Sequence, residues 1–262
     1  MVSGALRRLA AACLLLVAAS ASAAACVAED FETHVSGASE CLLMRRYGPA
    51  EAATMIVWLH GNVSGGGPAN AHFAIARKAA EDFDNVLALP LVRPGYPDGA
   101  GESSSGSDNG RADNWQRATI AEIGTAIERL KSHYRPRSLV LVGHSGGAAI
   151  AAVLLGMLPQ LADAALLIAC PCDLVAWRGG RPGPVWTSES PQRWIGPVSA
   201  RTKVIALTGS RDATTAPELG RAYVERLRAR GIDAAFELAP GMGHIDVLRS
   251  EAVMRAIREL LP

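Results

Sequence analysis

The chain has 262 residues, of which 49% are apolar and 19% are charged. This length suits one α/β domain with a large core and is too short for two ordinary domains plus an export signal, while the composition excludes a disordered chain. The net charge of +1 and the lack of a lysine- or arginine-rich run leave no electrostatic case for a nucleic acid partner.

The N-terminal segment is typical of a removable secretory signal. Arg7 and Arg8 precede the apolar stretch Leu9–Ala19, and alanines and serines that offer A-x-A cleavage sites follow. We therefore expect a signal peptide at residues 1–25 and a mature domain at 26–262 that is exported to the periplasm or secreted. We expect no integral membrane span in the mature chain.

Two alternatives keep the chain at a membrane. Apolar and small residues continue to Ala28, so an uncleaved anchor could just span a bilayer. The three alanines before Cys26 resemble a weak bacterial lipoprotein box, which would attach a lipid to that cysteine.

Four cysteines remain after removal of the signal, and an oxidising compartment favours their pairing. Cys26 and Cys41 could join the new N-terminus to the second strand, and Cys170 and Cys172 are close enough for a local bridge. Free buried thiols are the alternative. The C-x-C spacing argues against zinc, and we expect no metal.

Hydrophobic patterning predicts eight strands that alternate with helices after the second strand. The expected strands are 31–35, 41–47, 54–59, 86–91, 139–142, 164–169, 203–208 and 234–239, and the expected helices are 69–83, 115–133, 148–158, 217–230 and 246–260. The first two strands are expected to form an antiparallel edge. The alternation predicts an α/β fold with a doubly wound, mostly parallel sheet of about eight strands and helices on both faces.

Two long irregular segments interrupt this pattern. The loop 93–114 is either solvated or borders a site, since it leaves the carboxyl end of a central strand. The segment 173–200 resembles a short lid insertion, and its tryptophans either form its own small core or line an apolar pocket. Those tryptophans are Trp177, Trp186 and Trp194.

The motif Gly-His-Ser-Gly-Gly at 143–147 joins an apolar strand to a small-residue helix. The flanking glycines are explained if Ser145 has a strained backbone, because a Cβ at either position would crowd the strand and helix that meet there. Such a turn lifts the Ser145 hydroxyl out of the core and makes it a candidate nucleophile.

A serine nucleophile needs a base, and the base needs an orienting acid. Of the six histidines, His244 alone follows the last strand in a glycine-flanked loop. Asp212 follows the penultimate strand, and the order Ser145, Asp212, His244 is the one expected for this type of turn. Asp173 is the runner-up acid, and Asp246 is better explained as a helix cap.

Attack on a carbonyl also needs donors for the oxyanion, and losing one typically costs ~3 kcal/mol. One donor is expected to be the backbone N–H of Gly146, directly after the nucleophile. The other is expected to be the backbone N–H of Asn62, in the His60–Gly61–Asn62 sequence after a central strand.

These motifs together resemble the α/β-hydrolase family. The resemblance covers almost all of the mature region and rests on HGN at 60–62, GHSGG at 143–147, GSRD at 209–212 and GMGH at 241–244, with RPGY at 93–96 as a further match. It implies an acyl-enzyme mechanism with Ser145 as nucleophile, His244 as base and Asp212 as acid, without a metal or cofactor. The brevity of the lid region argues against a bulky lipid substrate.

The leading hypothesis is therefore a serine hydrolase that cleaves a small-molecule carboxylic ester or acyl substrate. A peptidase or amidase with the same triad is the nearest alternative, although no anchor for a substrate amine is evident in the sequence. A catalytically inactive hydrolase fold that serves as a binding protein would predict a damaged triad, and the triad is intact. Nucleotide binding lacks support, since neither G-x-G-x-x-G nor a P-loop motif is present.

Overall fold

A computed structural model describes residues 25–111, 115–179 and 187–262. Except for residue 25, the expected signal peptide lies outside this range, as does Trp186 of the expected lid. Of the helices in the described ranges, none has the length and apolar character needed to cross a membrane.

Six parallel strands form the central sheet, in the order β4-β3-β5-β6-β7-β8. They are β3 (Thr54–Leu59), β4 (Val86–Leu91), β5 (Ser138–His144), β6 (Ala164–Ile168), β7 (Lys203–Gly209) and β8 (Ala234–Ala239). The order reverses between β3 and β5, where the chain first steps toward β4 and then crosses back. Such a switch point opens a crevice at the carboxyl ends of the strands.

The remaining two strands are separate from the sheet, which therefore has six strands rather than about eight. β1 (His34–Ser36) and β2 (Cys41–Leu43) form an antiparallel hairpin. The chain after β2 leaves this hairpin and makes isolated antiparallel bridges to β4, through Met44 and Tyr47. The expected strand 41–47 is thus divided between two partners.

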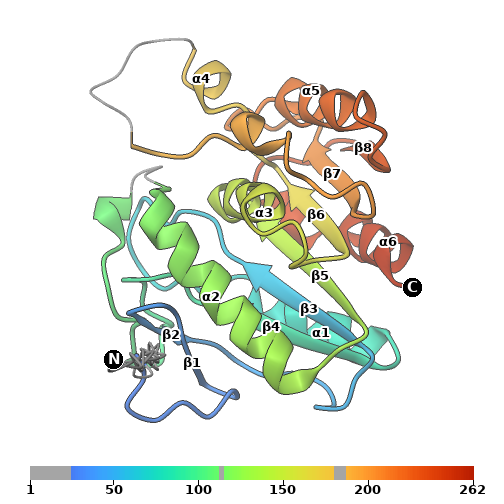
Figure 1. Ribbon diagram of the computed structural model, residues 1–262. Helices are drawn as coiled ribbons and strands as arrows, with labels where there is room; N and C mark the ends of the chain where they lie inside the picture. Colours follow the sequence, from blue (N-terminus) through green and yellow to red (C-terminus); the bar gives the residue numbers. More distant parts are fainter. Residues whose placement is uncertain (1–24, 112–114, 180–186) are drawn as a thin grey trace, which may run out of the picture.

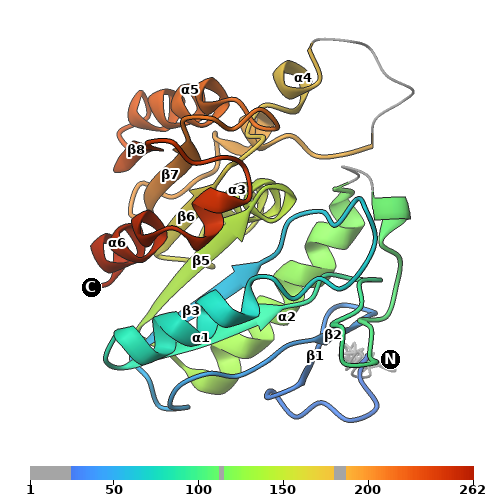
Figure 2. The ribbon, with the colours of Figure 1, turned by 180° about the vertical axis from the view of Figure 1, so that it is seen from behind.

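Helices cover both faces of the sheet, as predicted. Right-handed crossovers in opposite directions place their helices on opposite faces. Figure 1 shows α2 and α3 in front of the sheet, and Figure 2, the view from behind, shows α1 and α6 in front of the opposite face. The longer helices are α1 (Phe73–Asp82), α2 (Arg117–Tyr134), α3 (Gly146–Met157), α5 (Pro217–Arg228) and α6 (Glu251–Leu260).

The core is divided into two layers by the alternation of side chains along each strand. In β3, Met55 and Val57 pack into the layer under α2, α3 and α5, whereas Ile56 and Trp58 pack into the layer over α1 and α6. All six residues of β3 are buried, which explains its continuous apolar sequence. The sheet is therefore a rigid frame for the loops at its carboxyl edge.

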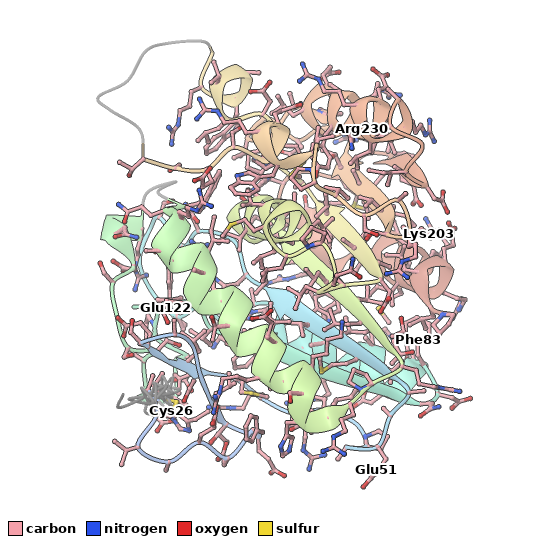
Figure 3. The ribbon with its side chains drawn as sticks, in the orientation of Figure 1. Cys26, Glu51, Phe83, Glu122, Lys203 and Arg230 are labelled. Atoms are coloured by element: carbon pink, nitrogen blue, oxygen red, sulfur yellow. A yellow bond between two sulfur atoms is a disulfide. The ribbon has the colours of Figure 1, made fainter. Side chains whose placement is uncertain are left out.

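Two disulfides lie outside the core strands. Cys26 pairs with Cys41 and ties the start of the described chain to strand β2 of the hairpin (Figure 3). Cys170 pairs with Cys172 directly after β6. The lid-like segment then begins with the short helix α4 (Leu174–Trp177), and after the gap it contains the 3-10 turn η2 (Pro191–Trp194).

Candidate active site

The register of the sheet brings the candidate residues to one edge. Leu59 pairs with both Leu91 and Gly143, and Gly209 pairs with Ala239, so neighbouring strands end nearly level. The sequence-predicted residues lie just past these ends, in loops or, for Gly146, at the first position of α3. Helix α4 lies beyond the same edge (Figure 1).

Ser145 occupies a strained turn between β5 and α3. Its φ of 53° and ψ of −121° lie in a region that side-chain-bearing residues rarely adopt, and its N–H donates to the Ile168 carbonyl at 2.8 Å. A Cβ at Gly143 would overlap the backbone of Gly147, and a Cβ at Gly147 would overlap the carbonyl of Leu59. The two glycines therefore permit the tight turn, as the sequence led us to expect.

His244 and Asp212 are hydrogen bonded. The Nδ1–H of His244 donates to Asp212 Oδ2 at 2.8 Å, and the other carboxylate oxygen accepts the backbone N–H groups of Thr214 and Thr215 at 2.9 and 2.8 Å. Burial alone would raise the pKa of the Asp212 carboxyl, but the bond from His244 and those from the two backbone groups outweigh burial and hold the pKa below its ordinary value. This carboxylate is ionised at neutral pH and fixes the ring of His244 with Nε2 free.

The backbone of His244 is also held by the residue before the nucleophile. His144 lies in the strand end itself, and its Nε2–H donates to the His244 carbonyl at 2.9 Å. Burial, reinforced by the charge of a protonated His244, lowers the pKa of His144 to about 4, so the ring is neutral at pH 7. No hydrogen bond joins the Ser145 hydroxyl to His244 in the described chain, a bond that is often long before substrate binds.

The loop after β3 packs directly on the nucleophile. A Cβ on Gly61 would lie 3.0 Å from the Cβ of Ser145 and 3.1 Å from the His144 carbonyl. Asn62 follows, and a Cβ on Gly146 would lie 2.5 Å from Asn62 Oδ1. The two expected oxyanion donors, Asn62 and Gly146, therefore belong to segments in contact.

His60 shapes this loop through hydrogen bonds. Its Nε2 accepts the backbone N–H of Arg93 at 2.9 Å, which leaves Nδ1–H to donate to the Gly61 carbonyl at 2.7 Å. Full burial lowers the pKa of His60 well below its ordinary value, and the charge of Arg93 adds to this effect. A neutral imidazole with both nitrogens occupied is a structural link between β3 and β4.

The two other carboxylates that the sequence raised have local roles. Asp173 caps α4, with its Oδ1 accepting the N–H groups of Val175 and Ala176 at 3.1 Å each. Asp246 does not cap the final helix, because it opens the 3-10 turn η3 (Asp246–Arg249) and α6 begins after Ser250. Of these acidic residues, Asp212 is the one that the fold brings to His244.

Sequence reasoning missed Trp115, which links three parts of the site. Its Nε1–H donates to Asn62 Oδ1 at 3.3 Å, and its ring stacks on that of Trp177 at 5.8 Å between centroids. Trp177 in turn donates to the Thr214 carbonyl at 2.7 Å, in the loop that bears the acid. The only available clue was that Trp115 follows the long loop 93–114.

No group of three or more histidine, cysteine or acidic side chains in the described ranges is arranged to hold a metal ion. The four cysteines that were considered as zinc ligands are bonded to one another in the two disulfides.

The chain matches no protein-family model and no curated protein in sequence. Its fold is similar to that of Est1E from Butyrivibrio proteoclasticus, with a TM-score of 0.67 and 15% identity over 86% of this chain and 96% of that one. It is also similar to the Pyrococcus furiosus esterase Pf2001, with a TM-score of 0.63 and 14% identity over 87% and 89% of the two chains.

A third similar structure is the acylaminoacyl peptidase of Pyrococcus horikoshii. Its TM-score is 0.63 at 12% identity, and the match covers 87% of this chain but only 41% of that one. At such identities the likeness concerns the fold and leaves the substrate open. Together with the parallel sheet and its helices, these neighbours show that the chain has the α/β-hydrolase fold.

Proposed function

We propose that the chain is a serine hydrolase that cleaves a carboxylic ester through an acyl-enzyme intermediate. The observation that carries this proposal is the hydrogen bond from His244 to Asp212, at the same sheet edge as the strained turn that presents Ser145. A nucleophile, a base and an orienting acid on three separate strand ends are what acyl transfer requires.

The proposed reaction has two halves, acylation and deacylation, and in each half His244 acts first as a base and then as an acid. Ser145 Oγ attacks the substrate carbonyl as His244 Nε2 takes its proton, and the N–H groups of Gly146 and Asn62 stabilise the oxyanion. His244 then gives the proton to the leaving alcohol, and water repeats the sequence to release the acid. Asp212 stabilises the imidazolium that forms in both halves.

A fluorophosphonate probe tests the mechanism directly. We expect covalent labelling of the wild-type protein and loss of labelling in Ser145→Ala and His244→Ala. Because such variants remove nucleophilic catalysis, ester hydrolysis is expected to fall by about 10⁵- to 10⁶-fold. Labelling that persists in Ser145→Ala would refute the assignment, and an unlabelled wild-type protein would favour the inactive binding protein.

The same triad could serve a peptidase or amidase, and one of the similar structures is a peptidase. A panel of acyl esters of increasing chain length beside aminoacyl amides separates the two activities. Because the structure of Est1E was obtained with ferulic acid bound, the panel should include a hydroxycinnamate ester. Preferential cleavage of the amides would move the proposal to the peptidase class.

We also propose that residues 1–25 are removed on export and that 26–262 form one domain with the lid-like insertion at 173–200. The two disulfides support an oxidising compartment. The mass of the exported protein tests this proposal, since cleavage after residue 25 predicts a chain that begins at Cys26. A retained N-terminus would indicate the uncleaved anchor, and a lipid adduct on that cysteine would indicate the lipoprotein.

A further inference from the structure

Arg93 is a buried cation that has no acidic partner among the residues that the structure describes. It follows β4 directly, and only 3% of its surface is exposed. Its Nη1 donates to Asn62 Oδ1 at 2.8 Å and to the His60 carbonyl at 3.3 Å, and its buried Nε finds no hydrogen-bond partner within residues 25–111, 115–179 and 187–262. No carboxylate of the described chain forms an ion pair with it.

Such an arrangement is costly, because buried charges are normally paired. The guanidinium nevertheless stays protonated, since the pKa of arginine is far above neutral. The guanidinium carbon of Arg93 lies 5.2 Å from the centroid of the Tyr96 ring. The guanidinium carbon of Arg111 lies 5.3 Å from the same centroid, so two cations share this ring. Both hydrogen bonds that the Arg93 side chain makes in the described part of the chain go to the loop after β3, which points to a role in that loop.

The acceptor that Arg93 contacts is held from a second side. Trp115 Nε1 also donates to Asn62 Oδ1, and a Cβ on Gly146 would lie 2.8 Å from that nitrogen. Two donors from different segments therefore fix one side-chain oxygen against the backbone of Gly146. Fixing this oxygen also fixes the peptide of Asn62, whose backbone N–H is the expected oxyanion donor.

We propose that Arg93 is a positioning residue of the oxyanion hole, which orients Asn62 through its side-chain oxygen and places an unpaired positive charge beside the developing oxyanion. This inference rests on the proposed function. The negative charge on the carbonyl oxygen appears only as the tetrahedral intermediate forms. The contribution of Arg93 should therefore appear in kcat and leave KM nearly unchanged.

The test compares variants on a neutral ester, p-nitrophenyl acetate. We expect Arg93→Met to lower kcat by about 10- to 100-fold, as for loss of a hydrogen bond to a charged group, with KM within about threefold. Arg93→Lys keeps the charge and should retain an intermediate kcat. Arg45→Met is the matched control, because Arg45 is paired with Asp98 and should leave kcat unchanged.

A double-mutant cycle tests the route through Asn62. Asn62→Ala retains the backbone N–H and removes the oxygen, so its effect and that of Arg93→Met should not add. Phenylboronic acid, which forms a tetrahedral adduct on a serine nucleophile, should bind more weakly to Arg93→Met by about the factor lost in kcat. If Arg93→Met does not fold, Trp115→Phe removes the second donor to the same oxygen and should lower kcat in the same way.

The outcomes separate this inference from the function on which it rests. A wild-type protein that neither hydrolyses esters nor reacts with the fluorophosphonate overturns both. An active wild-type protein with a folded Arg93→Met variant of unchanged kcat overturns the inference alone. A defect confined to the KM of an ester that bears a carboxylate would make Arg93 a substrate anchor and would also overturn it.

Discussion

On the β7–β8 side of Ser145 a carboxylate accepts hydrogen bonds from three donors. On the β3–β4 side a guanidinium lies buried beside polar groups, and no described residue provides an acid for it. Asp212 receives His244 and two backbone N–H groups, while Arg93 donates to Asn62 and to a carbonyl. The first arrangement compensates its charge locally, and the second does not. The charges at this edge of the sheet are therefore distributed unevenly. The uncompensated positive charge of Arg93 lies on the side where we expect the oxyanion.

The largest expected loss of kcat comes from a substitution on the β7–β8 side, where the charge of Asp212 is compensated. Asp212→Asn keeps the shape of the acid but no longer favours the required tautomer of His244, and we expect kcat to fall by about 10⁴-fold. Asp173→Asn is the matched control, because asparagine also caps a helix and α4 should keep its start. Steady-state kinetics decide the matter, and a larger loss in Asp173→Asn would transfer the role of the acid.

The β3–β4 side and the β7–β8 side of the site should also lose their contributions to folding stability at different pH values. Burial lowers the pKa of His72 to about 4 from an ordinary 6.5, and the pKa of His60 is lowered as well, so the unfolded chain binds more protons in this window. Stability on the β3–β4 side is therefore complete above about pH 6.5 and is lost as the pH falls toward 4. The lowered pKa of Asp212 instead preserves its contribution until the pH falls below the ordinary value of 3.8.

Chemical denaturation at pH 7 and pH 4.5 measures this difference. In His72→Gln, an amide can still donate to the Leu91 carbonyl that His72 contacts at 2.9 Å, but it does not titrate. The variant should lose less stability on acidification than the wild type, by on the order of 2–3 kcal/mol. An equal loss in both proteins would show that His72 does not contribute to the pH dependence.

A smaller effect is expected from the contact between Gly61 and the nucleophile. The added methyl group in Gly61→Ala would lie 3.0 Å from the Cβ of Ser145, and displacement of either backbone should lower kcat by about 10- to 100-fold. Gly65→Ala is the control in the same loop, since no atom lies within 4 Å of its added methyl group. Equal kinetics for the two variants would mean that the loop adjusts freely around Ser145.

The smallest expected effect concerns the link from the nucleophile turn to the base. His144→Phe keeps an aromatic ring but removes the donor to the His244 carbonyl, and one neutral hydrogen bond corresponds to about 3- to 10-fold in kcat. His133→Phe is the control, because the His133 ring stacks on Phe31. Unchanged kinetics in His144→Phe would show that the His244 loop is held by Asp212 alone.

Much of the sheet could be predicted from the sequence, because buried parallel strands are continuous apolar runs. The expected bounds of β3, β4 and β8 agree with the structure. The predicted α/β fold with helices on both faces is confirmed. The error lay in the N-terminal strands, where pairing partners rather than patterning decide which residues join a sheet.

Helix starts were harder to predict because distant residues determine them. Trp115 was expected to open a helix, but its N–H and carbonyl bond to Ser188 and Glu189 of the returning lid segment, and α2 begins at Arg117. The expected helix at 69–83 begins only at Phe73, since the N–H of Ala69 bonds to the Pro97 carbonyl.

The candidate site divides in the same way. The triad candidates were readable as strand-end residues in the right order, and the fold places Asp212 and His244 in contact; their catalytic roles remain predictions. The two hydrogen bonds that Arg93 and Trp115 donate to Asn62 Oδ1 could not be predicted. No sequence spacing relates either residue to the Asn62 side chain, which is more than 30 residues away.

The way in which the lid-like segment is attached at the end of β6 has a consequence for protein engineering. The Cys170–Cys172 disulfide fixes the exit from β6. The N–H of Gln192 donates to the Cys172 carbonyl, and Ser190 Oγ accepts from the N–H of Leu174, so the part of the segment between Leu174 and Ser190 leaves and returns at one place. A foreign segment grafted between these two ends would start and finish on the same anchor. Exchanging this segment would then be a way to vary substrate preference without changing any strand of the sheet.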